Sequence, residues 1–150
     1  MDIFEGIKQD HHEARELMEQ IAKTTNRSEK KRRELFDQFR LQIWAHEKLE
    51  EATFYQMLKQ KGLAKEILEA LNEHQVAGNV LEELNTAAIA TDEWLQKFCM
   101  LQELIQHHMQ EEEDEYFELG RKKLTDKEAS KLGEEFAQRK QAVLHAITPI

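Results

Sequence analysis

The sequence predicts an all-α protein, an up-down-up-down four-helix bundle with an additional C-terminal helix. The 150 residues include one proline, Pro149, and five glycines, so little interrupts helices. Apolar residues recur at steps of three and four, and no stretch alternates apolar with polar residues as a half-buried strand does. The expected connections are short, which makes consecutive long helices antiparallel neighbours.

Capping residues and breakers divide the chain into its elements. In chain order, we expect helices at residues 3–23, 29–60, 64–89, 93–119 and 126–147. Ser28 can cap the second helix and Thr91 the fourth, because their hydroxyls accept hydrogen bonds from free backbone N–H groups. Lys61-Gly62 is a typical helix stop, and Thr125 with Glu128 has the spacing of a capping box.

Length and composition indicate one soluble domain, residues 1–150, with the bundle at about 3–119 and the appended helix at about 126–147. Gly120 is expected to follow the end of the fourth helix. With 40% hydrophobic residues the chain is too apolar for disorder. The formal net charge of −9 argues against nucleic acid as a partner.

No apolar run approaches the roughly 18 residues of a membrane span, and no signal-peptide core is present, so no membrane partner is expected. Cys99 is the only cysteine, so no intramolecular disulfide can form. A cytoplasmic location and a buried, inert thiol are the expectations.

A histidine interrupts the apolar stripe of each of the four bundle helices. These histidines are His11, His46, His74 and His108, and Glu50 and Glu112 follow the second and fourth of them by four residues. The other three histidines, His12, His107 and His145, lie off the stripes and are expected at the surface. The polar residues on otherwise apolar faces therefore require an explanation.

The two halves of the chain repeat. A shift of the sequence by 63 residues places His11 on His74. A shift by 62 residues superposes the pairs His46/His108, Glu50/Glu112, Glu51/Glu113, Phe54/Tyr116 and Tyr55/Phe117. Each half is thus a helical hairpin that offers one histidine from its first helix and H-x-x-x-E from its second. Packing the hairpins together brings four histidines and two glutamates into one core.

This spacing favours a metal site. Side chains at i and i+4 share one helix face about 6 Å apart, so both can reach one ion. Burying two carboxylates without a counter-charge costs many kcal/mol, and no Lys or Arg lies on the stripes near Glu50 or Glu112. A metal cation is the simplest counter-charge, and imidazole with carboxylate suits iron, manganese or zinc.

Other chemistries lack their motifs. A ferritin-like centre needs E-x-x-H, and no glutamate stands three residues before any histidine. The run from His46 to Glu50 resembles H-E-x-x-H but ends in glutamate, so it does not support a zinc protease. No phosphate-binding loop or nucleophile-elbow motif is present.

The constellation resembles the hemerythrin family, in its HHE cation-binding branch. The resemblance spans roughly residues 3–119 and lies in Asp10-His11, His46 to Glu51 with Phe54-Tyr55, Glu73-His74, and His108 with Glu112-Glu113 and Tyr116-Phe117. It implies two non-haem iron ions, with manganese or zinc as substitutes and an oxo or hydroxo bridge. It also implies that His11 and His46 bind one ion, His74 and His108 bind the other, and Glu50 and Glu112 bridge them.

The chain departs from the oxygen-carrying members in the third and fourth expected helices, 64–89 and 93–119. Gly78 stands four residues after His74, where those members have another histidine, and the last carboxylate follows His108 by four residues rather than five. An open position on each metal argues against simple oxygen carriage. In this respect the chain resembles family members associated with oxygen or nitric oxide sensing, peroxide handling or iron-centre repair. The roles of Glu47, Glu51, Glu113 and Tyr116 stay open. For the three glutamates, the alternatives are a solvated side chain, support of a ligand residue, or direct binding of the metal.

Three functional hypotheses follow. The first is a di-iron protein that binds oxygen, nitric oxide or peroxide in sensing, storage or stress response. The second is a di-iron enzyme that turns over peroxide or nitric oxide, so enzymatic activity stays open. The third is a structural helical interaction module with adventitious metal. The sequence identifies no redox or protein partner.

Overall fold

The computed structural model describes residues 1–147, so Pro149 lies outside the described part. The elements in order are α1 Ile3–Ala22, α2 Glu29–Glu50, η1 Glu51–Tyr55, α3 Gln56–Gln60, α4 Ala64–Thr86, α5 Asp92–Glu111, η2 Glu112–Tyr116, α6 Phe117–Lys123 and α7 Asp126–Ile147. Within the described residues every such element is helical, which confirms the all-α prediction.

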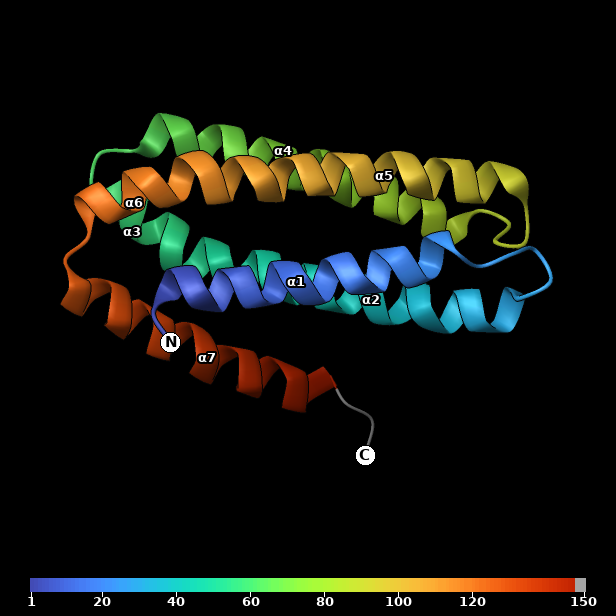
Figure 1. Cartoon of the computed structure of the whole chain (residues 1–150), viewed down its shortest axis with the longest axis horizontal. Coiled ribbons are helices and arrows are strands. Elements are labelled where there is room, and N and C mark those ends of the chain that lie inside the picture. The colour runs from blue at the N-terminus through green and yellow to red at the C-terminus, as the bar shows by residue number, and fades with distance from the viewer. Residues whose placement is uncertain (148–150) are drawn as a thin grey trace.

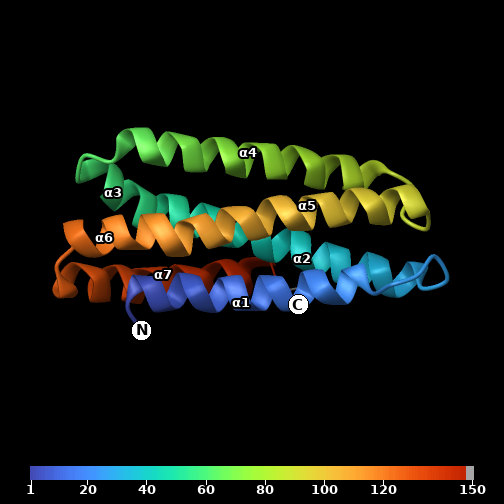
Figure 2. The ribbon, with the colours of Figure 1, turned by 45° about the horizontal axis from the view of Figure 1, so that its top comes forward.

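The bundle consists of four antiparallel rods. The rods are α1, the continuous run α2–η1–α3, α4, and the continuous run α5–η2–α6 (Figures 1 and 2). The last helix, α7, packs along α1 and α2 on the outside of the bundle (Figure 1). The predicted up-down-up-down bundle with an additional C-terminal helix is confirmed.

Two π-helical turns, η1 and η2, interrupt what the sequence predicts as simple α-helices. The first follows Glu50 directly, and the second begins at Glu112, so each half of the chain has a π turn next to its buried glutamate. A π turn accommodates one extra residue and rotates the following helix relative to the preceding one. The side chains beyond each turn therefore face other directions than a regular α-helix predicts.

Most helix ends follow the predicted signals. Gly62 has φ 95°, a backbone conformation that favours glycine. The Thr91 hydroxyl accepts from the Trp94 N–H at 3.1 Å, whereas Ser28 precedes α2 without a capping side-chain bond. Thr125 forms its capping box with Glu128.

Gly120 does not follow the fourth helix, as predicted, but lies inside α6. A Cβ atom there would come within 3.0 Å of the Phe4 ring and 3.1 Å of the Phe54 ring. Close packing of three chain segments, rather than helix termination, therefore accounts for this glycine.

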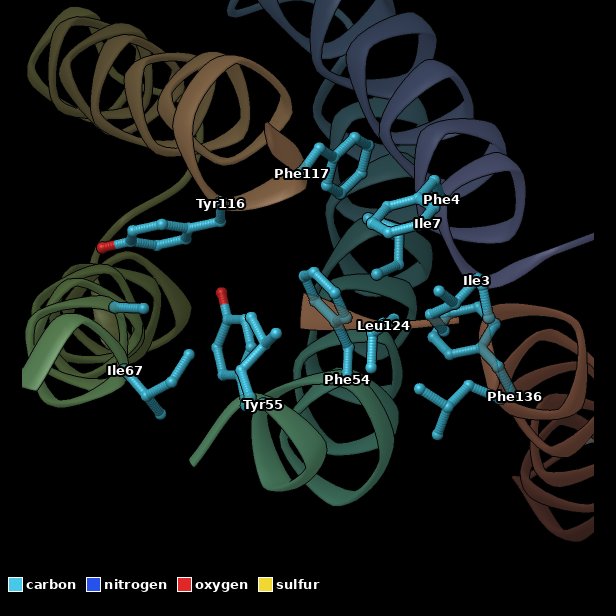
Figure 3. Packing of buried hydrophobic residues seen from close by; sticks show 14 of the residues in the cluster. Ile3, Phe4, Ile7, Phe54, Tyr55, Ile67, Tyr116, Phe117, Leu124 and Phe136 are labelled. Carbon is cyan, nitrogen blue, oxygen red and sulfur yellow. The ribbon is translucent and has the colours of Figure 1, made fainter. Parts of the chain in front are cut away.

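Two hydrophobic clusters fill the interior, one on each side of a central polar layer. The first surrounds Phe4, Phe54 and Phe117, whose rings meet edge to face (Figure 3). The second contains Phe36 and Phe98. On each rod, the histidine of the predicted site lies between residues of the two clusters, so the fold surrounds the polar layer with apolar side chains.

Surface and interior expectations are largely confirmed. The side chains of His12 and His107 are 66% and 76% exposed, and His145 is exposed. Cys99 is half-buried, so the expectation of a buried thiol was wrong, because α5 turns this side chain partly outward. No helix in residues 1–147 is long and apolar enough to cross a membrane.

Candidate metal centre

The six predicted ligand residues converge in the central polar layer. His11, His46, His74 and His108 come from α1, α2, α4 and α5, while Glu50 ends α2 and Glu112 begins η2. Both glutamates are fully buried, and the histidine side chains are between 1% and 11% exposed. All four rods thus contribute to a polar layer that has almost no contact with solvent.

The two glutamates each face two histidines. The Glu50 carboxylate has one oxygen 3.5 Å from His46 Nε2 and the other 3.4 Å from His74 Nε2. The Glu112 carboxylate has one oxygen 3.0 Å from His11 Nε2 and the other 3.9 Å from His108 Nε2. Each carboxylate therefore presents one oxygen to each of two histidine pairs.

Potential donor atoms fall into two groups. In the first, atoms of His11, His46, Glu50 and Glu112 lie within 4.8 Å of one another, and we call this group position 1. In the second, atoms of Glu50, His74 and His108 meet the same limit, and we call this group position 2. Glu50 belongs to both groups, whereas Glu112 belongs only to position 1.

A carboxylate supports each histidine from behind. The Nδ1 atoms of His11, His46, His74 and His108 lie 2.8, 2.8, 2.8 and 3.0 Å from oxygens of Glu113, Asp10, Glu51 and Glu73. Because an ionised carboxylate only accepts hydrogen bonds, Nδ1 must donate. The Nε2 lone pair of a neutral ring then points inward, as metal-binding histidines require.

The hydrogen bonds from these carboxylates to the histidines follow the internal repeat of the sequence. Asp10 and Glu73 lie on the first helix of each half and hold the histidine of the second helix in the same half. Glu51 and Glu113 lie on the second helix of each half and hold the first histidine of the other half. The sequence left the latter two open and did not assign Asp10 and Glu73, although each directly precedes a repeated histidine.

The inward-facing atoms fit a cation. Among the described residues, His11 Nε2, both oxygens of Glu50 and one oxygen of Glu112 are buried without a hydrogen-bond partner. The Nε2 atoms of His74 and His108 lie only 3.1 Å apart. Lone pairs facing one another at this distance repel unless a proton or a metal ion lies between them. The residues present therefore fit a metal centre of nitrogen and oxygen ligands.

Without a metal, protons carry the compensating charge. Burial lowers the pKa of His74, but the neighbouring carboxylates of Glu50 and Glu51 outweigh this and raise the pKa to about 10. Burial raises the pKa of Glu50, but His46 and His74 hold it well below its ordinary value. Burial and then the charge of Glu50 raise the pKa of Glu112. A metal ion entering this layer must displace protons.

Tyr55 is a functional candidate that sequence spacing missed. Its hydroxyl donates to Glu112 and lies 3.3 Å from His108 Nε2, beside position 2. Tyr116 instead donates to the Glu66 carbonyl at 3.1 Å and points toward α4 (Figure 3). The two π turns account for this difference, because they rotate the residues that follow each glutamate.

A small cavity lies among the four histidines. Its volume is about 20 Å³, and Ile43, Ala77, Ile105 and Met109 supply apolar walls while half-buried Glu47 adds a carboxylate. A single water needs about 10–15 Å³ measured in this way, so the cavity suits an occupant of a few atoms. The space among the histidines is therefore about the size of a single ion or water molecule.

The comparisons with known proteins identify a family and a similar fold. The family model for the hemerythrin HHE cation-binding domain matches residues 2–119, while no curated protein matches the chain. A solved structure of a hemerythrin HHE cation-binding domain-containing protein from Mycobacterium kansasii is similar, at 23% identity and a TM-score of 0.87. That match covers 97% of this chain and 89% of the other, and it shows a shared fold. By its family-model match over most of its length, the chain belongs to the hemerythrin family.

Proposed function

We propose that the chain is a non-haem di-iron protein that binds oxygen, nitric oxide or peroxide in sensing, storage or stress response. One observation carries the proposal: four carboxylate-supported histidines direct Nε2 atoms at two buried carboxylates that face both histidine pairs. Membership of a cation-binding family supports a metal centre. Imidazole and carboxylate without thiolate favour iron, with manganese or zinc as substitutes.

Each residue has a role in this proposal. His11 and His46 hold one ion and His74 and His108 hold the other, while Glu50 and Glu112 bridge the two. When bound, an iron pair with an oxo or hydroxo bridge supplies redox-active Lewis acids for a small ligand. Gly78 contributes no side chain that could fill a further ligand position. The apolar walls around Ile43 and Ile105 restrict water at the ligand position.

We further propose that residues 1–150 form one hemerythrin-like domain in which α7 is integral. The helix packs against α1 and α2, and its Lys140 bonds Asp10, which supports His46. We also propose a cytoplasmic location, because a reducing compartment suits a chain whose one cysteine is half-buried.

Metal analysis after anaerobic reconstitution with ferrous iron tests the proposal. We expect two irons per chain, and near-ultraviolet and visible charge-transfer bands after exposure to air. His108→Ala should lose bound iron, whereas the matched control His107→Ala should not, because His107 is 76% exposed. Less than one iron per intact chain would overturn the proposal.

Catalytic turnover is the second candidate function. Tyr55 and Glu47 place a hydroxyl and a half-buried carboxylate beside the histidines, which are groups that can exchange protons with a bound peroxide. Steady-state peroxide consumption and nitric oxide reduction by the loaded protein separate the two functions. Turnover supports an enzyme, and its absence supports a binding protein.

The hypothesis of a structural interaction module with adventitious metal predicts a different result for two ligand substitutions. In that case His74→Ala and Glu112→Ala should fold as well as the parent chain with unchanged metal content. We expect instead that both variants lose metal. They should also lose the increase in melting temperature that bound metal gives, because binding stabilises only the folded chain.

A further inference from the structure

We infer, on the basis of the proposed metal centre, that its two positions are unequal. Position 2, at His74 and His108, takes up the first divalent cation and binds it more tightly than position 1. The internal repeat makes this comparison direct, because each supporting residue at one position has a counterpart at the other. The difference lies in the charges behind the supporting carboxylates.

Cations neutralise both supporting carboxylates at position 1. Arg15 donates to Glu113 at 3.0 Å, on the same oxygen that accepts from His11. Lys140 of α7 donates to the Asp10 oxygen that His46 does not use. Both carboxylates are largely buried, at 13% and 7% side-chain exposure, so solvent screens these ion pairs only partly.

Position 2 lacks these cations. Under the shift of 63 residues Arg15 corresponds to Gly78, and apart from the local helix backbone no atom of residues 1–147 lies within 4 Å of a Cβ placed there. Glu73, the counterpart of Asp10, has no Lys or Arg partner in residues 1–147. α7 belongs to neither half of the repeat, so the Lys140 contact has no counterpart.

Near position 2 there are one exposed lysine and one further carboxylate. Glu51 meets Lys48 at 3.5 Å, but that lysine is 56% exposed and well hydrated. Glu47 places an additional carboxylate beside His74 and Glu51, where the corresponding residue of the second half is Met109. The Tyr55 hydroxyl beside position 2 donates a hydrogen bond to Glu112 and is therefore neutral.

This difference in charge acts on the metal in two ways. A divalent cation is attracted more strongly to the position with the greater net negative charge. A carboxylate on Nδ1 also makes the imidazole a better donor, and a cation bonded to that carboxylate reduces the effect. Because changes behind metal-binding histidines alter affinity by about 10–100-fold, we expect a difference of that size between the positions.

Cobalt(II) alone is a suitable probe, since its visible absorption reports coordination. The double variant His11→Ala/His46→Ala retains position 2, and His74→Ala/His108→Ala retains position 1. Titration against a competing chelator should show about 10–100-fold tighter binding at position 2. The intact chain should bind cobalt in two resolved steps.

Charge substitutions in the otherwise intact chain test the cause without removing a ligand. Arg15→Gln combined with Lys140→Gln should tighten the weaker step and bring the two steps together. Gly78→Arg should weaken the tighter step. Arg139→Gln is the matched control, because Arg139 neighbours Lys140 on α7 but pairs with Glu135 at the surface. It should leave both steps unchanged.

The outcomes separate this inference from the proposed function. Two cobalt ions bound with equal affinity, or tighter binding at position 1, would overturn the inference and leave the two-metal centre standing. An effect of Arg139→Gln as large as that of the combined Arg15→Gln and Lys140→Gln substitutions would also overturn it. Failure of the intact chain to bind cobalt would remove the proposed function and the inference together.

Discussion

Asp10 holds His46 across the α1–α2 interface, with its carboxylate oxygen 2.8 Å from the imidazole Nδ1. Burial raises the pKa of Asp10, but His46 and Lys140 outweigh it and hold the pKa below its ordinary value. An ionised carboxylate at this place keeps the imidazole proton on Nδ1 and the lone pair of a neutral ring on the inward Nε2. The orientation of a candidate ligand therefore depends on a residue of a different helix.

Asp10→Asn should weaken metal binding at position 1 about 10–100-fold, because asparagine keeps the shape but loses the charge that orients and polarises His46. A cobalt titration of the variant that retains only position 1 measures this loss. Asp37→Asn is the control, since Asp37 is 48% exposed and pairs with Arg33 on the surface of α2. Equal affinities for the Asp10 variant and its parent would contradict the supporting role.

Glu112→Gln should remove metal without destabilising the metal-free chain. The pKa of Glu112 is raised by burial and by the charge of Glu50, so its ionised form is costly in the folded state. A glutamine amide can donate to the inward lone pair of His11 and still accept from Tyr55. Thermal melts should show an equal or higher melting temperature without metal, and a smaller gain on adding metal.

The control for this substitution is Glu118→Gln, because Glu118 is 66% exposed and pairs with Lys122. It should bind as much metal as the parent chain and gain as much stability on loading. A metal-free Glu112→Gln chain that melts well below its parent would show that the carboxylate is needed for folding itself.

Tyr55→Phe should destabilise the metal-free chain more than Tyr116→Phe, although both remove one oxygen atom. The first leaves a buried carboxylate oxygen of Glu112 without its hydroxyl donor, at a cost of about 1–3 kcal/mol. The second removes a bond to the Glu66 backbone carbonyl, at a cost of about 1 kcal/mol. Urea unfolding of the two variants makes the comparison, and the reverse order would contradict it.

The stability of the metal-free chain should fall as the pH rises. The pKa of His74 is about 10 in the folded chain against an ordinary value of 6.5, because Glu50 and Glu51 outweigh its burial. The stabilisation from its proton is thus fully present below pH 6.5 and is lost as the pH rises toward about 10. Melting temperatures across this range should decline without metal.

The metal-loaded chain provides the contrast for this prediction. A bound cation takes the place of the protons, so its melting temperature should vary much less over the same range. In the metal-free chain, His74→Gln should flatten the decline, because the amide does not titrate. A steep decline in that variant would assign the pH dependence to other groups.

Local signals were sufficient to predict most of the fold. Periodic apolar stripes located the helices, and Gly62, Thr91 and Thr125 marked ends where the backbone needs a left-handed residue or a hydroxyl acceptor. The prediction for Gly120 was wrong, because the sequence alone does not distinguish a glycine that packs against Phe4 and Phe54 from a glycine that ends a helix. Contacts between distant segments are not visible in local pattern.

The six inward residues were predictable because the repeat marks them twice. The hydrogen bonds behind them were not, since they depend on which rods lie side by side: Glu113 reaches His11 from the other half of the chain. The choice between Tyr55 and Tyr116 also escaped prediction. A π turn has no residue signature, and one extra residue redirects everything that follows it.

The π turns η1 and η2 connect two requirements that a regular helix cannot meet together. Upstream of each turn, the helix must aim a histidine at the polar layer. Phe54, inside η1, and Phe117, directly after η2, must both face the same aromatic cluster. The extra residue sets the phase between these two segments. Shortening either turn by one residue would therefore leave the histidine in place while turning Phe54 or Phe117 away from the aromatic cluster.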